Sequence, residues 1–154
     1  MTITEKMNSN KKTERNFEDV KISVKIKLAA LWVTLMFFYL YADVLAFYQP
    51  GHIEDVMSGE VVGIQINQIF LLGSAMLMAI PSVMVFLSLT LKAKANRWAN
   101  IILGILYAGV LLATMFIPVE TDEIWAYGIF YIIVEAFFIA VIVWYAWKWP
   151  KQEA

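Results

Sequence analysis

Residues 124–147 read IWAYGIFYIIVEAFFIAVIVWYAW, an almost wholly apolar stretch with one carboxylic acid, Glu135, near its middle. A helix rises ~1.5 Å per residue, so this segment is long enough to cross the roughly 30 Å hydrocarbon core of a bilayer. Glu135 would then lie close to the bilayer midplane, where a carboxyl group is costly and marks a functional candidate. The stretch therefore predicts a transmembrane helix with a polar centre.

Three other apolar stretches of similar length occupy residues 28–47, 67–91 and 98–117. Hydrophobic residues make up 61% of the chain and charged residues 16%, which excludes an ordinary soluble domain. We predict an all-α polytopic membrane protein, an antiparallel bundle of four transmembrane helices. It forms one domain over residues 17–151, after a flexible tail at residues 1–16 that is polar and without periodicity.

The charged residues are segregated by position. Of the twelve Lys and Arg residues, seven precede the first span, three lie in the predicted 92–97 turn and two follow the fourth span. The two opposite loops contain six acids and no Lys or Arg. Basic loops stay in the cytoplasm during membrane insertion. We expect a multi-pass protein of the bacterial cytoplasmic (inner) membrane with both termini in the cytoplasm.

Several classes of chemistry are excluded by residue type. The chain has no cysteine, which rules out disulfides, thiolate catalysis and iron–sulfur clusters. Its one histidine, His52, cannot form a bis-histidine haem or a histidine-based zinc site within a single chain. We predict no cofactor, no metal site and no nucleic-acid partner. Because no catalytic constellation is recognised, the sequence favours a protein that is not an enzyme.

The polar centre of the bundle involves more than one span. Tyr131 lies four residues before Glu135, on the same helix face, and Tyr107 and Pro81 are expected at a similar depth in their own spans. Pro81 removes a helical hydrogen bond and leaves the carbonyl of Leu77 free. Ser or Thr hydroxyls can satisfy such a carbonyl in a membrane helix, and Ser74 and Ser82 are available in the same span.

No predicted span contains Lys, Arg or His, so Glu135 lacks a cationic partner within the membrane. Desolvation favours the neutral acid, and we expect Glu135 to hold its proton at neutral pH. A second acid, Asp43, lies about four residues, or ~6 Å, from the outer end of the first span. Tyr39 precedes it by one turn on the same face. We expect Asp43 to face the bundle or the 48–66 loop rather than lipid.

Small residues and turn signals predict further local features. Gly104 with Ala108, and Gly109 with Ala113, are spaced to let helices approach closely. In the loop after the first span, residues 53–57 are expected to form a short interfacial helix that ends at Ser58-Gly59.

Five stretches, DVKISVKIKLAALW, YLYAD, AIPS, ANRWANIILGI and VIVWYAWKWP, resemble a family of small bacterial four-helix membrane proteins of uncharacterised function. The likeness covers roughly residues 19–150, and Asp43 and Glu135 both lie within it. It implies the fold and the membrane compartment, and it brings no reaction with it. A looser likeness to DoxX-like four-helix proteins concerns architecture, which does not transfer function.

Two functions from different classes are open at this point. In the first, the protein is a small proton- or cation-coupled transporter. Its proton or ligand site is formed by Glu135, Tyr131, Tyr107, Asp43 and Tyr39. In the second, the aromatic-rich bundle is a non-enzymatic membrane subunit that binds a lipid, a quinone or a partner protein. An isomerase or reductase acting on a lipophilic substrate comes third.

A purely structural role for Glu135 is a further alternative. A neutral Glu135 would then act as an interhelical hydrogen-bonding group, worth roughly 1 kcal/mol. The partners expected from the sequence are membrane lipid, a small lipophilic or cationic ligand, and either further copies of the chain or a larger membrane complex.

Overall fold

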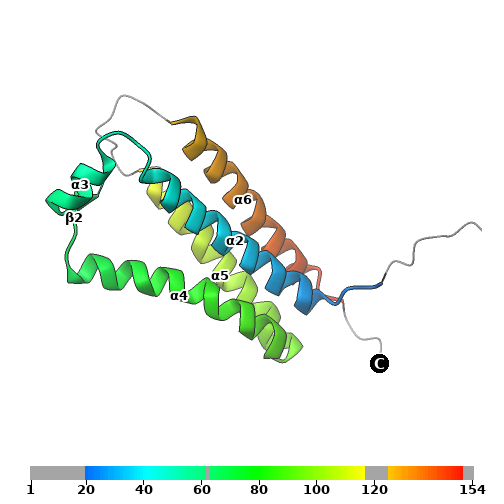
Figure 1. Cartoon of the computed structure of the whole chain (residues 1–154). Coiled ribbons are helices and arrows are strands. Elements are labelled where there is room, and N and C mark those ends of the chain that lie inside the picture. The colour runs from blue at the N-terminus through cyan, green and yellow to red at the C-terminus, as the bar shows by residue number, and fades with distance from the viewer. Residues whose placement is uncertain (1–19, 62, 117–124, 151–154) are drawn as a thin grey trace, which may run out of the picture.

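Four long helices dominate the computed structural model, which describes residues 20–61, 63–116 and 125–150. They are α2 (Val24–Ala46), α4 (Gln68–Thr90), α5 (Ala93–Thr114) and α6 (Ala126–Trp147) (Figure 1). Each is long and apolar enough to cross a membrane by length and composition. The prediction of an all-α protein with four membrane-spanning helices is confirmed.

The first helix begins earlier than hydropathy alone predicts. The side chain of Ser23 accepts a hydrogen bond from the backbone N–H of Ile26 at 3.5 Å, so α2 starts at Val24 rather than at residue 28. A serine in this position satisfies one of the free N–H groups of the first helical turn. The polar first turn of α2 was missed because the span was recognised by its apolar residues.

The connection between α4 and α5 is shorter than expected. Residues 92–97 were predicted to form a turn, but α5 begins at Ala93, and Leu91 and Lys92 alone separate the two helices. Ala, Lys and Arg have good helix propensity, so this polar segment adds a turn to the helix instead of forming a loop. At its other end α5 stops at Thr114, before the predicted boundary at residue 117.

The four helices do not pack equally on one another. α2 lies along both α4 and α6, and α6 lies along α5. α4 and α5 are consecutive in sequence but make few contacts with each other. In Figure 1, α4 diverges from the other three helices toward its N-terminal end. The helices therefore pack closely in the order α4, α2, α6 and α5, and the bundle is only loosely closed between α5 and α4.

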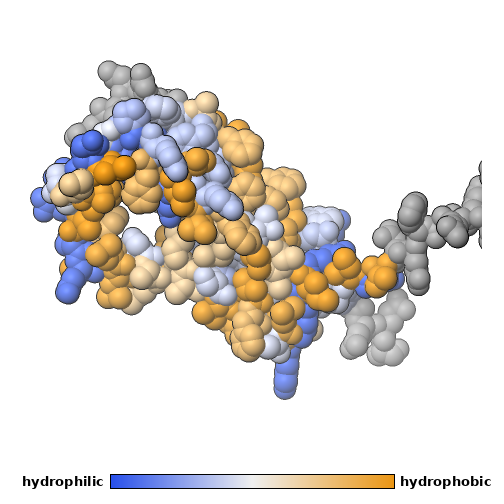
Figure 2. Space-filling view, viewed as in Figure 1, coloured by the Kyte–Doolittle hydropathy of each residue, from blue (hydrophilic) through white to orange (hydrophobic). Residues whose placement is uncertain are grey.

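The two ends of the bundle differ in charge. We call one the basic end, defined by Lys25, Lys27, Lys92, Lys94, Arg97 and Lys148, and the other the acidic end, defined by Glu54, Asp55 and Glu60. Figure 2 shows hydrophilic side chains gathered at the two ends and mainly hydrophobic side chains between them. This banding is expected of a helical bundle that crosses a bilayer.

The buried core lies in the half of the bundle next to the basic end. Its fully buried side chains include Trp32, Leu35, Met84, Tyr107 and Ile142. Beyond the level of Tyr107 toward the acidic end, Leu111 is the one buried residue in the part of the chain that the structure describes. Figure 2 shows an opening at the acidic end, beside the start of α4.

A short helix and a hairpin connect α2 to α4 at the acidic end. The helix α3 (His52–Ser58) confirms the predicted short helix, and Gly59, at φ 90°, ends it in the left-handed conformation that favours glycine. The strands β1 (Glu60–Val61) and β2 (Ile64–Gln65) then pair antiparallel. This hairpin was not predicted, because two-residue strands are too short to show an alternating pattern.

One of the two predicted small-residue pairs mediates close helix packing. Gly104 is buried on α5, and a Cβ atom at this position would lie 2.5 Å from Cγ2 of Val143 on α6. Gly109 has no side-chain or neighbouring-helix atom within 4 Å of the corresponding position. The contact between α5 and α6 therefore depends on the glycine at 104 and not on the one at 109.

Candidate functional site

Glu135 of α6 is hydrogen-bonded to Tyr39 of α2. The hydroxyl of Tyr39 donates to Oε1 of Glu135 at 2.6 Å, and both side chains are half-buried. This is a short O–H···O hydrogen bond. It joins two helices near the middle of the predicted membrane span, where an unpaired carboxyl group would be costly.

The kink in α4 supplies a second part of the same layer. Pro81 has no N–H to offer the carbonyl of Leu77, and the hydroxyl of Tyr107 on α5 donates to that carbonyl instead. Ser82, one of the two serines considered for this role, donates to the carbonyl of Met78 at 2.9 Å. The free carbonyl is therefore satisfied from another helix, which ties α5 to α4 at the kink.

These two hydrogen bonds lie side by side. The rings of Tyr39 and Tyr107 have centroids 6.4 Å apart, so the two tyrosines connect Glu135 to the carbonyl of Leu77. Each of the four long helices contributes one oxygen-bearing group to this set. We call Tyr39, Leu77, Tyr107 and Glu135 the upper polar layer. The structure thus brings together three residues that the sequence singled out, with Pro81 providing the free carbonyl.

Tyr131 does not join the upper polar layer through a hydrogen bond to any described residue. Its ring packs edge-on against Phe38 of α2, with centroids 5.8 Å apart, and Phe38 also contacts Phe138 at 5.5 Å. Tyr131 and Phe138 lie on the same face of α6 as Glu135, one turn to either side. The wall between α2 and α6 next to the carboxyl group is therefore aromatic.

Asp43 is also separate from the upper polar layer. Its side chain is exposed and forms no hydrogen bond with a described residue, and the expectation that it faces the bundle or the 48–66 loop rather than lipid stays a prediction. Asp43 lies near the acidic end of α2, beyond the buried half of the bundle. The helices are less closely packed there, so the spacing that places Tyr39 and Asp43 on one face does not bury the acid.

A second cluster of polar residues lies closer to the basic end. The sequence did not predict that these residues form a hydrogen-bonded network. The indole N–H of Trp32 donates to Oδ1 of Asn100 at 2.7 Å, and the amide of Asn100 donates to Oδ1 of Asn96 at 2.7 Å. Nδ2 of Asn96 donates to the backbone carbonyl of Ser88 at 2.5 Å. All four residues are fully or almost fully buried. We call them the lower polar layer.

The lower polar layer was missed because its members come from three helices. The one signal in the sequence is the Asn-x-x-x-Asn spacing at 96 and 100, which places two amides on the same face of a helix. The partners Trp32 and Ser88 depend on how the helices align, and a single sequence does not give that alignment.

The two layers are related by a common helical step. Trp32 and Tyr39 are seven residues apart in α2, and Asn100 and Tyr107 are seven residues apart in α5. The layers are therefore separated by two helical turns, or roughly 10.5 Å. Trp32 packs edge-on against Tyr107 with ring centroids 5.9 Å apart, which brings the layers into contact. Buried Leu35 and Met84 occupy the same part of the core.

The upper polar layer offers oxygen atoms only: a carboxyl group, two phenolic hydroxyls and a backbone carbonyl. Among the described residues, no group of three or more His, Cys, Asp or Glu side chains is placed to hold a metal ion. A single carboxyl group with neutral oxygen donors is suited to binding a proton or a cation of low charge. Tyr39 is positioned to respond when the carboxyl group binds or releases a proton or a cation, because its hydroxyl contacts the carboxyl oxygen directly.

The fold and its polar centre define a small polytopic membrane protein with four helices able to span a bilayer. A family model described as a family of unknown function (DUF6326) matches residues 17–154, and the chain belongs to that family. No curated protein and no solved structure gives a significant match. The predicted membership of an uncharacterised family is confirmed, whereas the looser likeness to DoxX-like proteins stays a prediction.

Proposed function

We propose that this protein is a small proton- or cation-coupled transporter and that Glu135 is its exchange site. The observation that carries the proposal is the 2.6 Å hydrogen bond between Tyr39 and Glu135, within a layer to which all four long helices contribute. A mid-depth carboxyl group linked to each of the four long helices can pass a change in protonation or cation binding to the whole bundle.

The broken hydrogen-bond ladder of α4 supports the same function. Transporters commonly place their coupling-ion sites where a membrane helix is interrupted and a backbone carbonyl is free. Here Pro81 frees the carbonyl of Leu77, and Tyr107 links that carbonyl to the layer that contains Glu135. A helix with a proline near its middle is also the element best able to bend during transport.

The unequal packing of the two halves supports access to Glu135 from the acidic end. The buried core lies on the basic side of the site, and the opening seen in Figure 2 lies on the acidic side. Glu54, Asp55 and Glu60 at that end would raise the local concentration of cations. With the basic end in the cytoplasm, as the charge distribution predicts, the site would be reached from outside the cell.

The proposal is tested by proton flux into proteoliposomes that contain a pH-sensitive dye, with a membrane potential imposed as the driving force. Tetraphenylphosphonium uptake under a pH gradient serves as the cation assay. Wild-type protein should exceed empty liposomes in at least one assay, and Glu135→Gln should abolish that activity. Asp43→Asn is the matched control, because Asp43 is an exposed acid outside the upper polar layer. Equal activity in wild-type and Glu135→Gln proteins would overturn the proposal.

A second candidate is a non-enzymatic membrane subunit that binds a lipid, a quinone or a partner protein, including a further copy of this chain. Residues 68–80 of α4 include no buried side chain, which leaves this half of the helix available for such contacts. Purification from native membranes in mild detergent would test this function. Quinone or lipid at a fixed ratio to protein, without Glu135-dependent transport, would favour the second candidate over the first.

A further inference from the structure

The two consecutive helices α4 and α5 are hydrogen-bonded to each other at two levels. Asn96 donates to the carbonyl of Ser88, and Tyr107 donates to the carbonyl of Leu77. Both pairs belong to one antiparallel register, because eleven residues separate Leu77 from Ser88 and Asn96 from Tyr107. The two levels are thus three turns apart, or roughly 16 Å along the helices.

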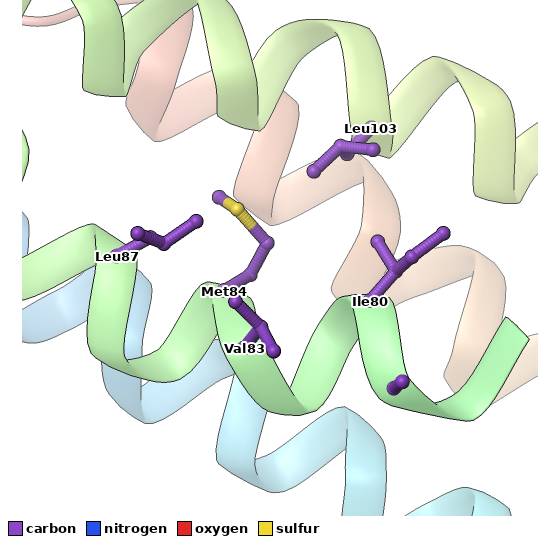
Figure 3. A pocket seen from close by; sticks show the side chains of 6 residues that line it. Ile80, Val83, Met84, Leu87 and Leu103 are labelled. Atoms are coloured by element: carbon purple, nitrogen blue, oxygen red, sulfur yellow. The ribbon is translucent and has the colours of Figure 1, made fainter. Parts of the chain in front are cut away.

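Between these two levels the helices separate and leave a hollow of about 280 Å³. Pro81 lies on this part of α4, where it removes a helical hydrogen bond, and the N-terminal half of the helix diverges from the other helices (Figure 1). The residues that line the hollow are all apolar: Ala79, Ile80, Val83, Met84 and Leu87 from α4, and Leu103 from α5. Figure 3 shows Ile80, Met84 and Leu87 spaced along α4, with Leu103 facing them from α5.

The chemistry of the hollow favours a hydrocarbon chain over water. A bound water needs two to four polar partners, and the lining residues have no polar side chain. Val83 of the lining and the nearby Phe86 are 52% and 65% exposed, so this apolar surface of α4 is accessible to a surrounding membrane. A lipid acyl chain is available at this surface, and it matches both the apolar lining and the hydrocarbon of the surrounding membrane.

The hollow forms part of a groove between α4 and α5. This groove is positively charged at the end where the turn joins the two helices. Lys92 follows Leu87 by five residues, and both Lys92 and Lys94 are exposed at the turn between α4 and α5. Nζ of Lys25 also lies at this turn, where it donates to the carbonyl of Leu91 at 2.7 Å. The described residues near this turn include no acid. Basic clusters next to a groove between membrane helices bind anionic lipid headgroups.

We propose that the groove between α4 and α5 binds one anionic phospholipid, with an acyl chain in the hollow and the phosphate against Lys92 and Lys94. Such a lipid would fill the space between the two hydrogen-bonded levels and hold α4 in its bent form. This site is independent of the proposed transport function, because neither Glu135 nor Tyr39 contributes to it.

Native mass spectrometry of the purified full-length protein tests the site, with phosphatidylglycerol or phosphatidylcholine of identical acyl chains as the added probe. Wild-type protein should retain one phosphatidylglycerol in preference to phosphatidylcholine. Each neutralised lysine, Lys92→Gln or Lys94→Gln, should weaken retention of phosphatidylglycerol roughly fivefold. Lys148→Gln is the matched control, since this exposed lysine lies at the basic end but directly after α6, away from the turn between α4 and α5.

The acyl-chain position is tested by filling the hollow. Ala79→Leu places extra methyl groups at a lining position and should weaken retention of both lipids, whereas Ala75→Leu, one turn earlier and outside the lining, should not. Equal retention of the two lipids by wild-type protein would overturn the headgroup site. Equal effects of Ala79→Leu and Ala75→Leu would overturn the acyl-chain site. Proton flux is measured separately, so failure of the lipid site is distinguished from failure of the transport function.

Discussion

The hydroxyl of Tyr107 on α5 donates a hydrogen bond to the carbonyl of Leu77 on α4, the carbonyl that Pro81 leaves without a helical donor. The kink in α4 is therefore satisfied by a neighbouring helix rather than by water or by a serine of its own helix. The ring of Tyr107 also contacts Trp32 and Tyr39, and so it touches both polar layers. One side chain links the bend of α4 to the candidate exchange site.

The cost of losing this hydrogen bond should depend on Pro81. Tyr107→Phe leaves the Leu77 carbonyl unsatisfied and should lower the free energy of unfolding by ~0.6–1.7 kcal/mol, the range for hydrogen bonds between membrane helices. Pro81→Ala restores a backbone N–H to that carbonyl, so Tyr107→Phe should cost clearly less in this background. Reversible unfolding of the four proteins of the double-mutant cycle in mixed micelles measures the coupling.

Tyr131→Phe is the control for this cycle, because the Tyr131 hydroxyl forms no hydrogen bond with a described residue. Its effect should stay within about 0.5 kcal/mol in both backgrounds. If Tyr107→Phe costs the same with and without Pro81, the hydroxyl does not compensate for the proline.

Glu135 should carry its proton at neutral pH, because the described parts of the four spans place no cationic side chain beside it. Infrared spectroscopy should then show a carboxylic-acid C=O band at pH 7 that is absent in Glu135→Gln. In Tyr39→Phe the band should move to higher frequency, since the carboxyl group loses its hydrogen bond from the phenol. Tyr41→Phe, at an exposed position of the same helix, should leave the band unchanged. A carboxylate band that disappears in Glu135→Gln would instead show an ionised acid.

The lower polar layer should contribute measurably to stability. Asn100→Ala removes the acceptor of the Trp32 indole N–H and the donor to Asn96, all within a fully buried cluster. An unpaired buried polar group costs about 1–3 kcal/mol. Thermal unfolding should therefore show a large loss in Asn100→Ala. Trp144→Phe, which changes an exposed indole, should have little effect; equal losses in the two variants would contradict a structural role for this cluster.

The sequence predicts features that depend on one helix at a time. Four spans, the depth of Glu135 and the carbonyl freed by Pro81 all follow from hydropathy and spacing within a segment. The sequence included Tyr39 and Glu135 in one candidate site, but the local partner that it suggested for Tyr39 was Asp43, four residues along the same helix. The direct hydrogen bond from Tyr39 to Glu135 on α6 was not predicted. The bond between Trp32 and Asn100 was missed for the same reason. Contacts between helices depend on their relative rotation and register, which local patterns do not specify.

The orientation predicted from charge can be tested with two single-cysteine variants, since the chain has no cysteine of its own. A membrane-impermeant thiol reagent added to intact cells should label Ser58→Cys, in α3 at the acidic end. It should label Ala95→Cys, near the start of α5 at the basic end, only after the membrane is opened. Labelling of Ala95→Cys in intact cells would show the opposite orientation or a mixture of both.

Two glycines of α5 should respond in opposite ways to the same substitution. In Gly104→Ala the new Cβ would lie 2.5 Å from Cγ2 of Val143, a short β-branched side chain that cannot move aside without shifting its helix. Overpacking of this kind costs ~1–3 kcal/mol and exceeds the ~1 kcal/mol that replacing glycine by alanine contributes to a helix. Gly109→Ala meets no such neighbour within 4 Å and should be neutral or stabilising.

The rescue of Gly104→Ala by a second change identifies the cause. Val143→Ala removes the methyl group that the new Cβ would meet, so the double variant Gly104→Ala/Val143→Ala should unfold at a higher temperature than Gly104→Ala alone. Val143→Ala in the wild-type background should itself be destabilising, because it leaves space beside Gly104. Val143→Ala should thus destabilise the wild-type protein and stabilise the Gly104→Ala variant. This change of sign is specific to a direct contact between α5 and α6. If Gly104→Ala and Gly109→Ala have equal effects, the two helices do not pack at Gly104 as closely as the structure indicates.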